Sequence, residues 1–170
     1  MILDIVRYPD PSLKRVCQPV DRIDDDVRTL VADMAETMYA APGVGLAAPQ
    51  VGRDMRLLVM DPSGPEERND LRVLINPELE LRGEIITSER EGCLSVPFDY
   101  RADVKRHSKV FVKAQKLDGT FFEEEWDDFA AIIVQHEFDH LEGILFIDHI
   151  SRLRRSLLDA KVKKCLRHKG

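Results

Sequence analysis

The 170-residue sequence has few cysteines, few aromatic residues and no long apolar run. Its three cysteines are odd in number and widely spaced, which excludes a disulfide scaffold and fits a reducing compartment. The longest apolar stretch, residues 129–134, is far too short to cross a membrane, and Asp4 and Arg7 interrupt the start of the chain. We therefore expect a cytoplasmic protein that has no membrane partner and keeps a cysteine free for metal chemistry.

The sequence also lacks an excess of positive charge, internal repeats and low-complexity segments. Its formal net charge of −6 argues against general binding of DNA. This charge is uneven, because residues 151–170 hold eight Lys or Arg against one Asp, which leaves −13 for residues 1–150. The length and the 44% of hydrophobic residues fit one globular domain over residues 1–170, with a basic C-terminal helix at 151–170.

Apolar periodicity predicts helices at both ends of the chain and strands between them. The helices are expected at residues 24–40, 127–141 and 151–167. Strands are expected at 56–61, 72–75 and 84–87 and in a hairpin that joins 109–117 to 120–126 through Asp118-Gly119. Loops are expected at 41–52, which is rich in Gly and Pro, and at 62–70. This order predicts an α+β fold, a single domain of mostly antiparallel sheets around a central helix, with a C-terminal helix.

The last predicted helix is amphipathic. Its apolar residues are expected on one stripe, surrounded by basic side chains: Leu153, Leu157, Leu158, Val162 and Leu166.

The helix predicted over residues 127–141 carries two histidines one turn apart and a glutamate beside the first. His136 and His140 can therefore bind one ion from a single helix face, and Glu137 is suited to acid/base work. The rest of this face is apolar, where imidazoles without a metal would be costly to bury. The pattern indicates a metal-dependent hydrolase, although surface or core histidines produce the same spacing by chance.

A hydrolytic site of this kind needs a third protein ligand and keeps one position for water. Downstream of the histidines the candidates are Asp148, His149 and Asp159. Upstream, Cys93 follows Gly92, which permits a close approach of the backbone. A lone cysteine is more often a small core residue, so the residues alone leave the third ligand open.

Three separated segments combine these residues with a glycine-rich loop. They are Gly43-Val44-Gly45-Leu46-Ala47-Ala48-Pro49-Gln50, Glu91-Gly92-Cys93-Leu94-Ser95 and Gln135-His136-Glu137-Phe138-Asp139-His140. In order and spacing the chain resembles the peptide deformylases, from Ile5-Val6-Arg7-Tyr8-Pro9 to the final helix. The resemblance implies an iron-dependent enzyme of bacterial type. It would remove the formyl group from the N-terminal formylmethionine of new polypeptides, release formate and use Cys93 as the third ligand.

The resemblance also implies a role for each residue around the metal. Glu137 would activate a water with the metal, while the metal, the Gln50 amide and the Leu94 backbone N–H would stabilise the oxyanion. The implied substrate-binding residues are Val44, Gly45, Gly92, Arg101, Phe129, Ile132 and Ile133. Residues 96–100 before Arg101 form a segment one residue longer than in some members of the family. Fe²⁺ is the implied metal, although Cys and His ligands suit Zn²⁺, Ni²⁺ and Co²⁺ as well.

Other functions fit parts of this pattern. A general metallopeptidase would cleave internal peptide bonds, and a structural zinc site would recruit a fourth ligand and show no turnover. The basic C-terminal helix also has two interpretations. It is either a solvated face packed on its own domain or, as in related bacterial deformylases, a contact for the ribosome through attraction to phosphates of the RNA.

Overall fold

A computed structural model describes residues 1–169, so Gly170, the last residue of the predicted basic segment, lies outside the described residues. Five strands form one antiparallel sheet in the order in which they occur: β1 (Gly45–Ala47), β2 (Leu57–Met60), β3 (Arg72–Glu91), β4 (Ala102–Gln115) and β5 (Phe121–Asp127). The α-helices are α1 (Asp25–Ala40), α2 (Gly64–Glu67), α3 (Asp128–Leu141) and α4 (Arg152–Lys169). Short 3-10 helices are η1 (Pro11–Lys14), η2 (Ala48–Val51) and η3 (Phe146–His149). The predicted α+β class is confirmed.

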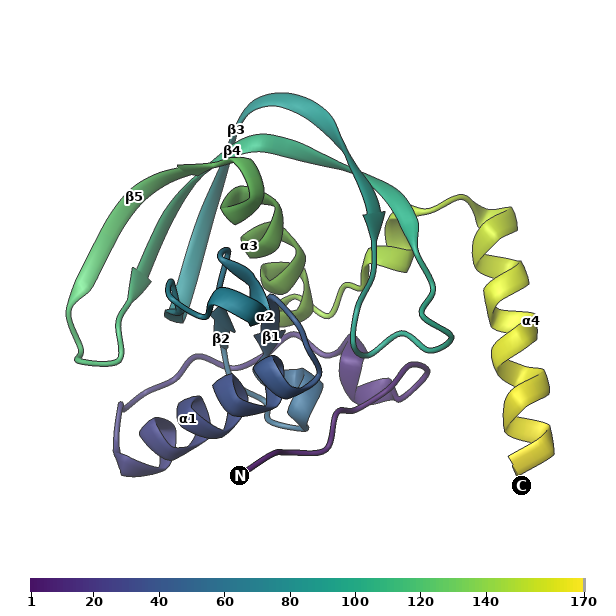
Figure 1. Ribbon diagram of the computed structural model, residues 1–170, viewed down its shortest axis with the longest axis horizontal. Helices are drawn as coiled ribbons and strands as arrows, with labels where there is room; N and C mark the ends of the chain where they lie inside the picture. Colours follow the sequence, from purple (N-terminus) through teal and green to yellow (C-terminus); the bar gives the residue numbers. More distant parts are fainter. Residues whose placement is uncertain (170) are drawn as a thin grey trace.

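Helix α3 lies at the centre of the molecule, and the long ribbon of β3 and β4 curves over it (Figure 1). Ala131, Ile133 and Val134 on α3 are almost fully buried against the sheet. The helix ends where it was expected to, because Gly143 adopts a φ of 75°. In that conformation the N–H of Ile144 reaches back 2.8 Å to the carbonyl of Asp139. Both metal-site histidines of the sequence pattern are thus on a buried helix.

Helix α1 covers a second part of the core. Asp24 caps its start by accepting a hydrogen bond of 3.0 Å from the backbone N–H of Val27. The apolar face that the sequence predicts packs on β1 and β2, with Leu30, Met34 and Met38 at most 4% exposed. Leu46 of β1 belongs to this cluster, whereas Ala47 belongs to the cluster that contains α3, so the short strand lies between the two parts of the core.

The sheet is more continuous than the sequence indicates. Residues 72–75 and 84–87, predicted as two short strands, belong to the single strand β3, and β4 begins at Ala102 rather than at residue 109. The register between β3 and β4 shifts at three places, and Asn76 and Gly83 adopt positive φ near two of them. Such bulges interrupt the alternation of apolar and polar residues from which a strand is recognised. The sequence pattern is therefore broken at positions where the strand itself continues.

Two predicted loops contain short regular elements. The segment 41–52 includes β1 and η2, and the segment 62–70 includes α2. Strand β1 has three residues, all buried, which is too short for a periodic pattern to show. The loop prediction was therefore wrong in the part that lies next to the site.

Helix α4 stands beside the main body of the molecule (Figure 1). Leu158 and Val162 are buried in a cluster with Tyr8, whereas Leu153, Leu157 and Leu166 are between 51% and 71% exposed. Only part of the predicted apolar stripe is therefore buried, because one narrow edge of α4 reaches the domain. No helix within residues 1–169 is long and apolar enough to cross a membrane.

Candidate metal centre and active site

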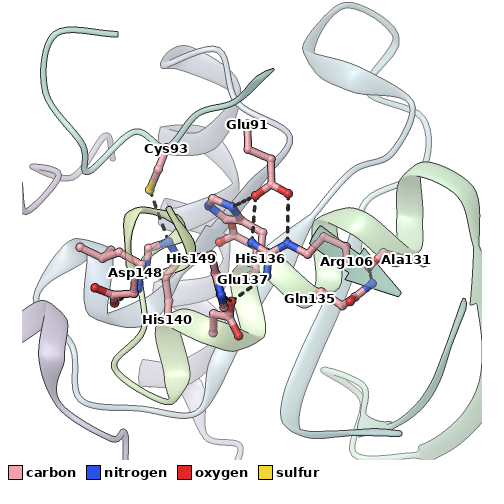
Figure 2. Close-up of polar contacts among 12 residues, drawn as sticks. Glu91, Cys93, Arg106, Ala131, Gln135, His136, Glu137, His140, Asp148 and His149 are labelled. Atoms are coloured by element: carbon pink, nitrogen blue, oxygen red, sulfur yellow. Dashed lines mark hydrogen bonds and ion pairs between the residues drawn. The ribbon is translucent and has the colours of Figure 1, made fainter. Parts of the chain in front are cut away.

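The side chains of Cys93, His136 and His140 converge on one point. Their candidate ligand atoms all lie within 4.8 Å of one another, and Cys93 Sγ is 3.4 Å from His140 Nε2. Figure 2 shows Cys93 facing His140 across the site, with His136 beside it. One thiolate and two imidazoles at this separation are a donor set that suits a divalent transition metal.

Two elements bring these ligands together. His136 and His140 project from the same face of α3, where they are 9% and 1% exposed. Cys93 lies in the turn just after β3, where its carbonyl accepts a hydrogen bond of 3.0 Å from the N–H of Val96. The upstream turn therefore brings the third candidate ligand to the two histidines.

The three downstream candidates are engaged elsewhere. Asp148 accepts a hydrogen bond of 2.9 Å from the N–H of Leu145 and pairs with Arg155. His149 lies 2.9 Å from Asp139, and Asp159 accepts a hydrogen bond from the Tyr8 hydroxyl. Within residues 1–169 the group of metal-ligating side chains contains three members, which does not favour a closed structural zinc site with four ligands.

A buried ionic network lies behind His136. Glu91 Oε1 is 3.0 Å from His136 Nδ1, so the Nε2 atom of the ring is left to face the site (Figure 2). Arg106 donates two hydrogen bonds of 2.8 and 3.0 Å to Glu91 and a third of 2.7 Å to Asp139. This carboxylate contact fixes both the orientation and the tautomer of the imidazole, as is usual for histidines that bind a metal.

The network also fixes the charge of Glu91. Burial on its own would raise the pKa of this carboxyl group, but hydrogen bonds from His136 and Arg106 outweigh it and lower the pKa to about 2. Arg106 is 5% exposed, and its pKa stays above the usual value because Glu91 and Asp139 offset the cost of burial. The His136 ring is therefore held by a carboxylate, not by a neutral acid.

Glu137 is buried next to the ligands. Its Oε1 lies 3.6 Å from His136 Nε2, and within the described chain its Oε2 has no hydrogen-bond partner. Burial raises the pKa of this carboxyl group to about 7. A Cβ atom on Gly45 would lie 2.8 Å from Glu137 Cγ, so the glycine of β1 leaves the room that Glu137 occupies. The arrangement is that of a buried carboxyl group that can take up and release a proton near neutral pH.

Gln50 is locked in place beside Cys93. Its Oε1 accepts a hydrogen bond of 2.9 Å from the N–H of Ala47, and its Nε2 donates to Ser95 Oγ at 3.1 Å and to Cys93 Sγ at 3.5 Å. With 1% of its surface exposed, the amide has a single orientation, in which the N–H group points toward the ligands.

A cavity of about 360 Å³ opens at this point. The predicted catalytic residues Gln50, Leu94 and Glu137 line it, together with Cys93 and His136. The predicted substrate-binding residues line it as well: Val44, Gly45, Gly92, Arg101, Phe129, Ile132 and Ile133. His140 is not among the lining residues and completes the ligand cluster from behind.

The residues that support the candidate ligands were not predicted from the sequence. Glu91 lies in one of the recognised segments, directly before the Gly-Cys pair, and this place in the motif was the available signal. Ser95, which binds the Gln50 amide, lies in the same segment. Arg106 carried no local signal, because its contact with Glu91 depends on the pairing of β3 with β4.

Comparison with known proteins agrees with this site. The sequence model described as polypeptide deformylase matches residues 2–156. The chain is 47% identical to a peptide deformylase of Azotobacter vinelandii over 99% of both chains, and 50% identical to that of Zymomonas mobilis over 96% of this chain and 94% of the other. The crystal structure of a peptide deformylase from Legionella pneumophila superposes with a TM-score of 0.90 at 40% identity, covering 99% of this chain and 98% of that one. The chain therefore belongs to the polypeptide deformylase family, the hydrolases that remove formyl from N-terminal formylmethionine.

Proposed function

We propose that deformylation by this chain runs at one divalent ion held by Cys93, His136 and His140, with Glu137 as the acid and base. The observation that carries the proposal is the placement of a buried, unpartnered carboxylate oxygen of Glu137 beside three converging ligand atoms. When bound, the ion would polarise the formyl carbonyl and lower the pKa of a water. Cys and His suit several metals, so the preference for Fe²⁺ rests on the resemblance of the sequence to the iron enzymes of the family.

Glu137 takes the proton of the attacking water and later delivers it to the departing amine. Its position supports both steps, because the carboxylate lines the cavity and lies 3.6 Å from the nearest ligand nitrogen. The bond between the formyl carbon and the amine nitrogen breaks, and the products are formate and a free N-terminal methionine. The same carboxyl group thus acts first as the base and then as the acid.

Negative charge develops on the formyl oxygen during the attack. The Gln50 side-chain amide and the Leu94 backbone N–H are the proposed donors to this oxygen. Support comes from the rigid hydrogen bonds of Gln50 and from the position of both residues on the wall of the cavity. Donors that are fixed before the reaction stabilise a developing charge without a cost of reorganisation.

The same cavity would hold the substrate. Phe129, Ile132 and Ile133 on α3 form the apolar side proposed for methionine, and Ile133 is 3% exposed. The backbone at Val44, Gly45 and Gly92 would bind the peptide chain.

A second proposal concerns α4, whose exposed basic side chains would contact ribosomal RNA. It is supported by the net charge of +7 over residues 151–170 and by the position of α4 at the side of the molecule (Figure 1).

Formate release from formyl-Met-Ala is the direct test. Metal-loaded Glu137→Gln and Gln50→Ala variants are expected to remain folded and to lose about 10²-fold or more in kcat, because each removes a group that acts in the transition state. Glu123→Gln, which removes a carboxylate on β5 outside the cavity, is the matched control and is expected to behave as wild type.

Acetyl-Met-Ala and peptides with only internal bonds complete the experiment. The wild-type enzyme is expected to leave them intact, whereas a general metallopeptidase would cleave internal bonds. Wild-type turnover in the metal-loaded Glu137→Gln variant would remove Glu137 from the mechanism.

A further inference from the structure

Two consecutive residues, the second of which lines the cavity, adopt an unusual backbone conformation. Phe98 and Asp99 have φ values of 69° and 50°, a backbone conformation that residues other than glycine rarely adopt. They lie in the turn between β3 and β4, within residues 96–100. A conformation of this kind persists where surrounding contacts hold it, and here it places the Asp99 side chain at the cavity.

Asp99 holds Arg101 by two hydrogen bonds. Oδ1 of Asp99 accepts from Nε at 3.2 Å and from Nη2 at 2.9 Å of the guanidinium group. This fixed guanidinium lies against the backbone of Gly92, since a Cβ atom there would be 2.7 Å from Arg101 Cζ. The Asp99 side chain is 85% exposed and the Arg101 side chain 46%. The pair therefore sits where solvent, or a bound peptide, meets the wall of the cavity.

The ring of Phe98, the residue before Asp99, contacts helix α4. The ammonium group of Lys161 lies 4.3 Å from the ring centroid, a distance at which cation and ring attract each other. The loop is thus held by two contacts. Lys161 contacts Phe98, which precedes Asp99, and Arg101 pairs with Asp99 itself. Both contacts keep the carboxylate of Asp99 at the mouth.

The charges that line the cavity mouth are balanced. Glu89 and Asp99 contribute two carboxylates, and Arg90 and Arg101 contribute two guanidinium groups. Glu91 also lines the cavity, but Arg106 neutralises it within the buried network. Loss of the Asp99 charge would leave an excess of one positive charge beside the path of a bound peptide.

We propose that Asp99 is a specificity-determining residue, which neutralises Arg101 and so sets the preference of the enzyme for charge on the substrate residues that follow formylmethionine. The inference rests on the proposed function, in which formylmethionine fills this cavity and the rest of the peptide leaves by its mouth. Asp99 acts on binding of the peptide and not on the reacting atoms, so its effect appears in KM.

The test compares three amidated peptides, formyl-Met-Ala-Lys, formyl-Met-Ala-Glu and formyl-Met-Ala-Ser. Asp99→Asn keeps the shape of the side chain and removes its charge. The ratio of kcat/KM for the Glu peptide to that for the Lys peptide is expected to rise about threefold or more at low salt, through KM. The rise shrinks in high salt, because both charges are exposed to solvent.

Two further variants complete the design. Arg101→Gln is expected to shift the ratio in the opposite direction, and Glu123→Gln, which removes an equal charge far from the cavity, is expected to leave it unchanged. An unchanged ratio in Asp99→Asn would overturn the proposal, and so would an equal loss of activity on all three peptides, which is the mark of a purely structural role. Formate release from the uncharged Ser peptide by the wild-type enzyme tests the proposed function separately.

Discussion

Gly45 and Glu137 occupy the site as a complementary pair. Strand β1 brings the backbone of Gly45 so close to Glu137 that a Cβ atom would lie 2.8 Å from Cγ and 2.9 Å from Cδ of the glutamate. The family resemblance implies a different use for this glycine, which is binding of the substrate. The contact adds a structural reason for glycine at this position. A side chain on residue 45 would collide with Glu137 and displace its carboxylate.

Gly45→Ala is expected to reduce kcat about tenfold or more, since a displacement of a reacting group by 1 Å can cost about 10²-fold in rate. The additional methyl group also overpacks the site, at a cost of about 1–3 kcal/mol in the free energy of unfolding. A double-mutant cycle with Glu137→Gln measures the coupling. The alanine is expected to cost little more once Glu137 has been changed, and an equal loss in both backgrounds would show that Gly45 acts elsewhere.

Glu91 offers a second prediction for a single residue. Glu91→Gln keeps an oxygen near His136 Nδ1 but removes the negative charge that orients the ring and pairs with buried Arg106. The affinity for the metal is expected to fall about 10- to 100-fold, as for other partners of metal-binding histidines. Competition with a chelator measures it. Glu84→Gln, an exposed change on the same strand, is the control, and equal affinities for the two variants would contradict the role of Glu91.

At the scale of elements, the long helices could be predicted from the sequence, whereas short helix α2 and the full length of the long strands could not. Helices α1 and α3 have clear caps or stops and one apolar face, so their bounds were predicted within one residue. Strand β3 carries bulges that break its alternation, and the pairing of β3 with β4 is a long-range property. For the same reason the contact between Arg106 and Glu91 could not be predicted, since it requires the register of two strands. The segments that carry the proposed ligands are continuous, and for these the sequence was sufficient to indicate a common site.

Helix α4 is the element on which the proposed ribosome contact depends. Replacing exposed Lys163, Lys164 and Arg167 with glutamine is expected to weaken binding to ribosomes at low salt, because fewer phosphates are neutralised. The difference is expected to shrink at high salt. The matched control replaces three exposed basic residues of the main body, Arg53, Lys109 and Lys113. Equal binding of both triple variants at low salt would identify α4 as a solvated face of the domain.

At the scale of the whole molecule, the proposed metal ligands join separate parts of the core. Helix α3 contributes Ala131, Ile133 and Val134 to the cluster beneath the sheet. Cys93 packs instead against the cluster that contains Tyr8, Phe146 and the inner edge of α4. An ion bound by Cys93 and by the histidines of α3 would therefore add a link between these two clusters.

Removal of the metal is therefore expected to lower the melting temperature. An ion at about 100 times its Kd stabilises the folded state by about 2.7 kcal/mol, and for a chain of this size each kcal/mol corresponds to about 2–4 °C. Thermal unfolding of the Ni²⁺-loaded and the chelated protein, followed by calorimetry, should differ by about 5–10 °C. Cys93→Ala loses one ligand and one link between the clusters, so its melting temperature should respond much less to Ni²⁺. Equal responses of this variant and the wild type would mean that the ion which stabilises the fold is bound without Cys93.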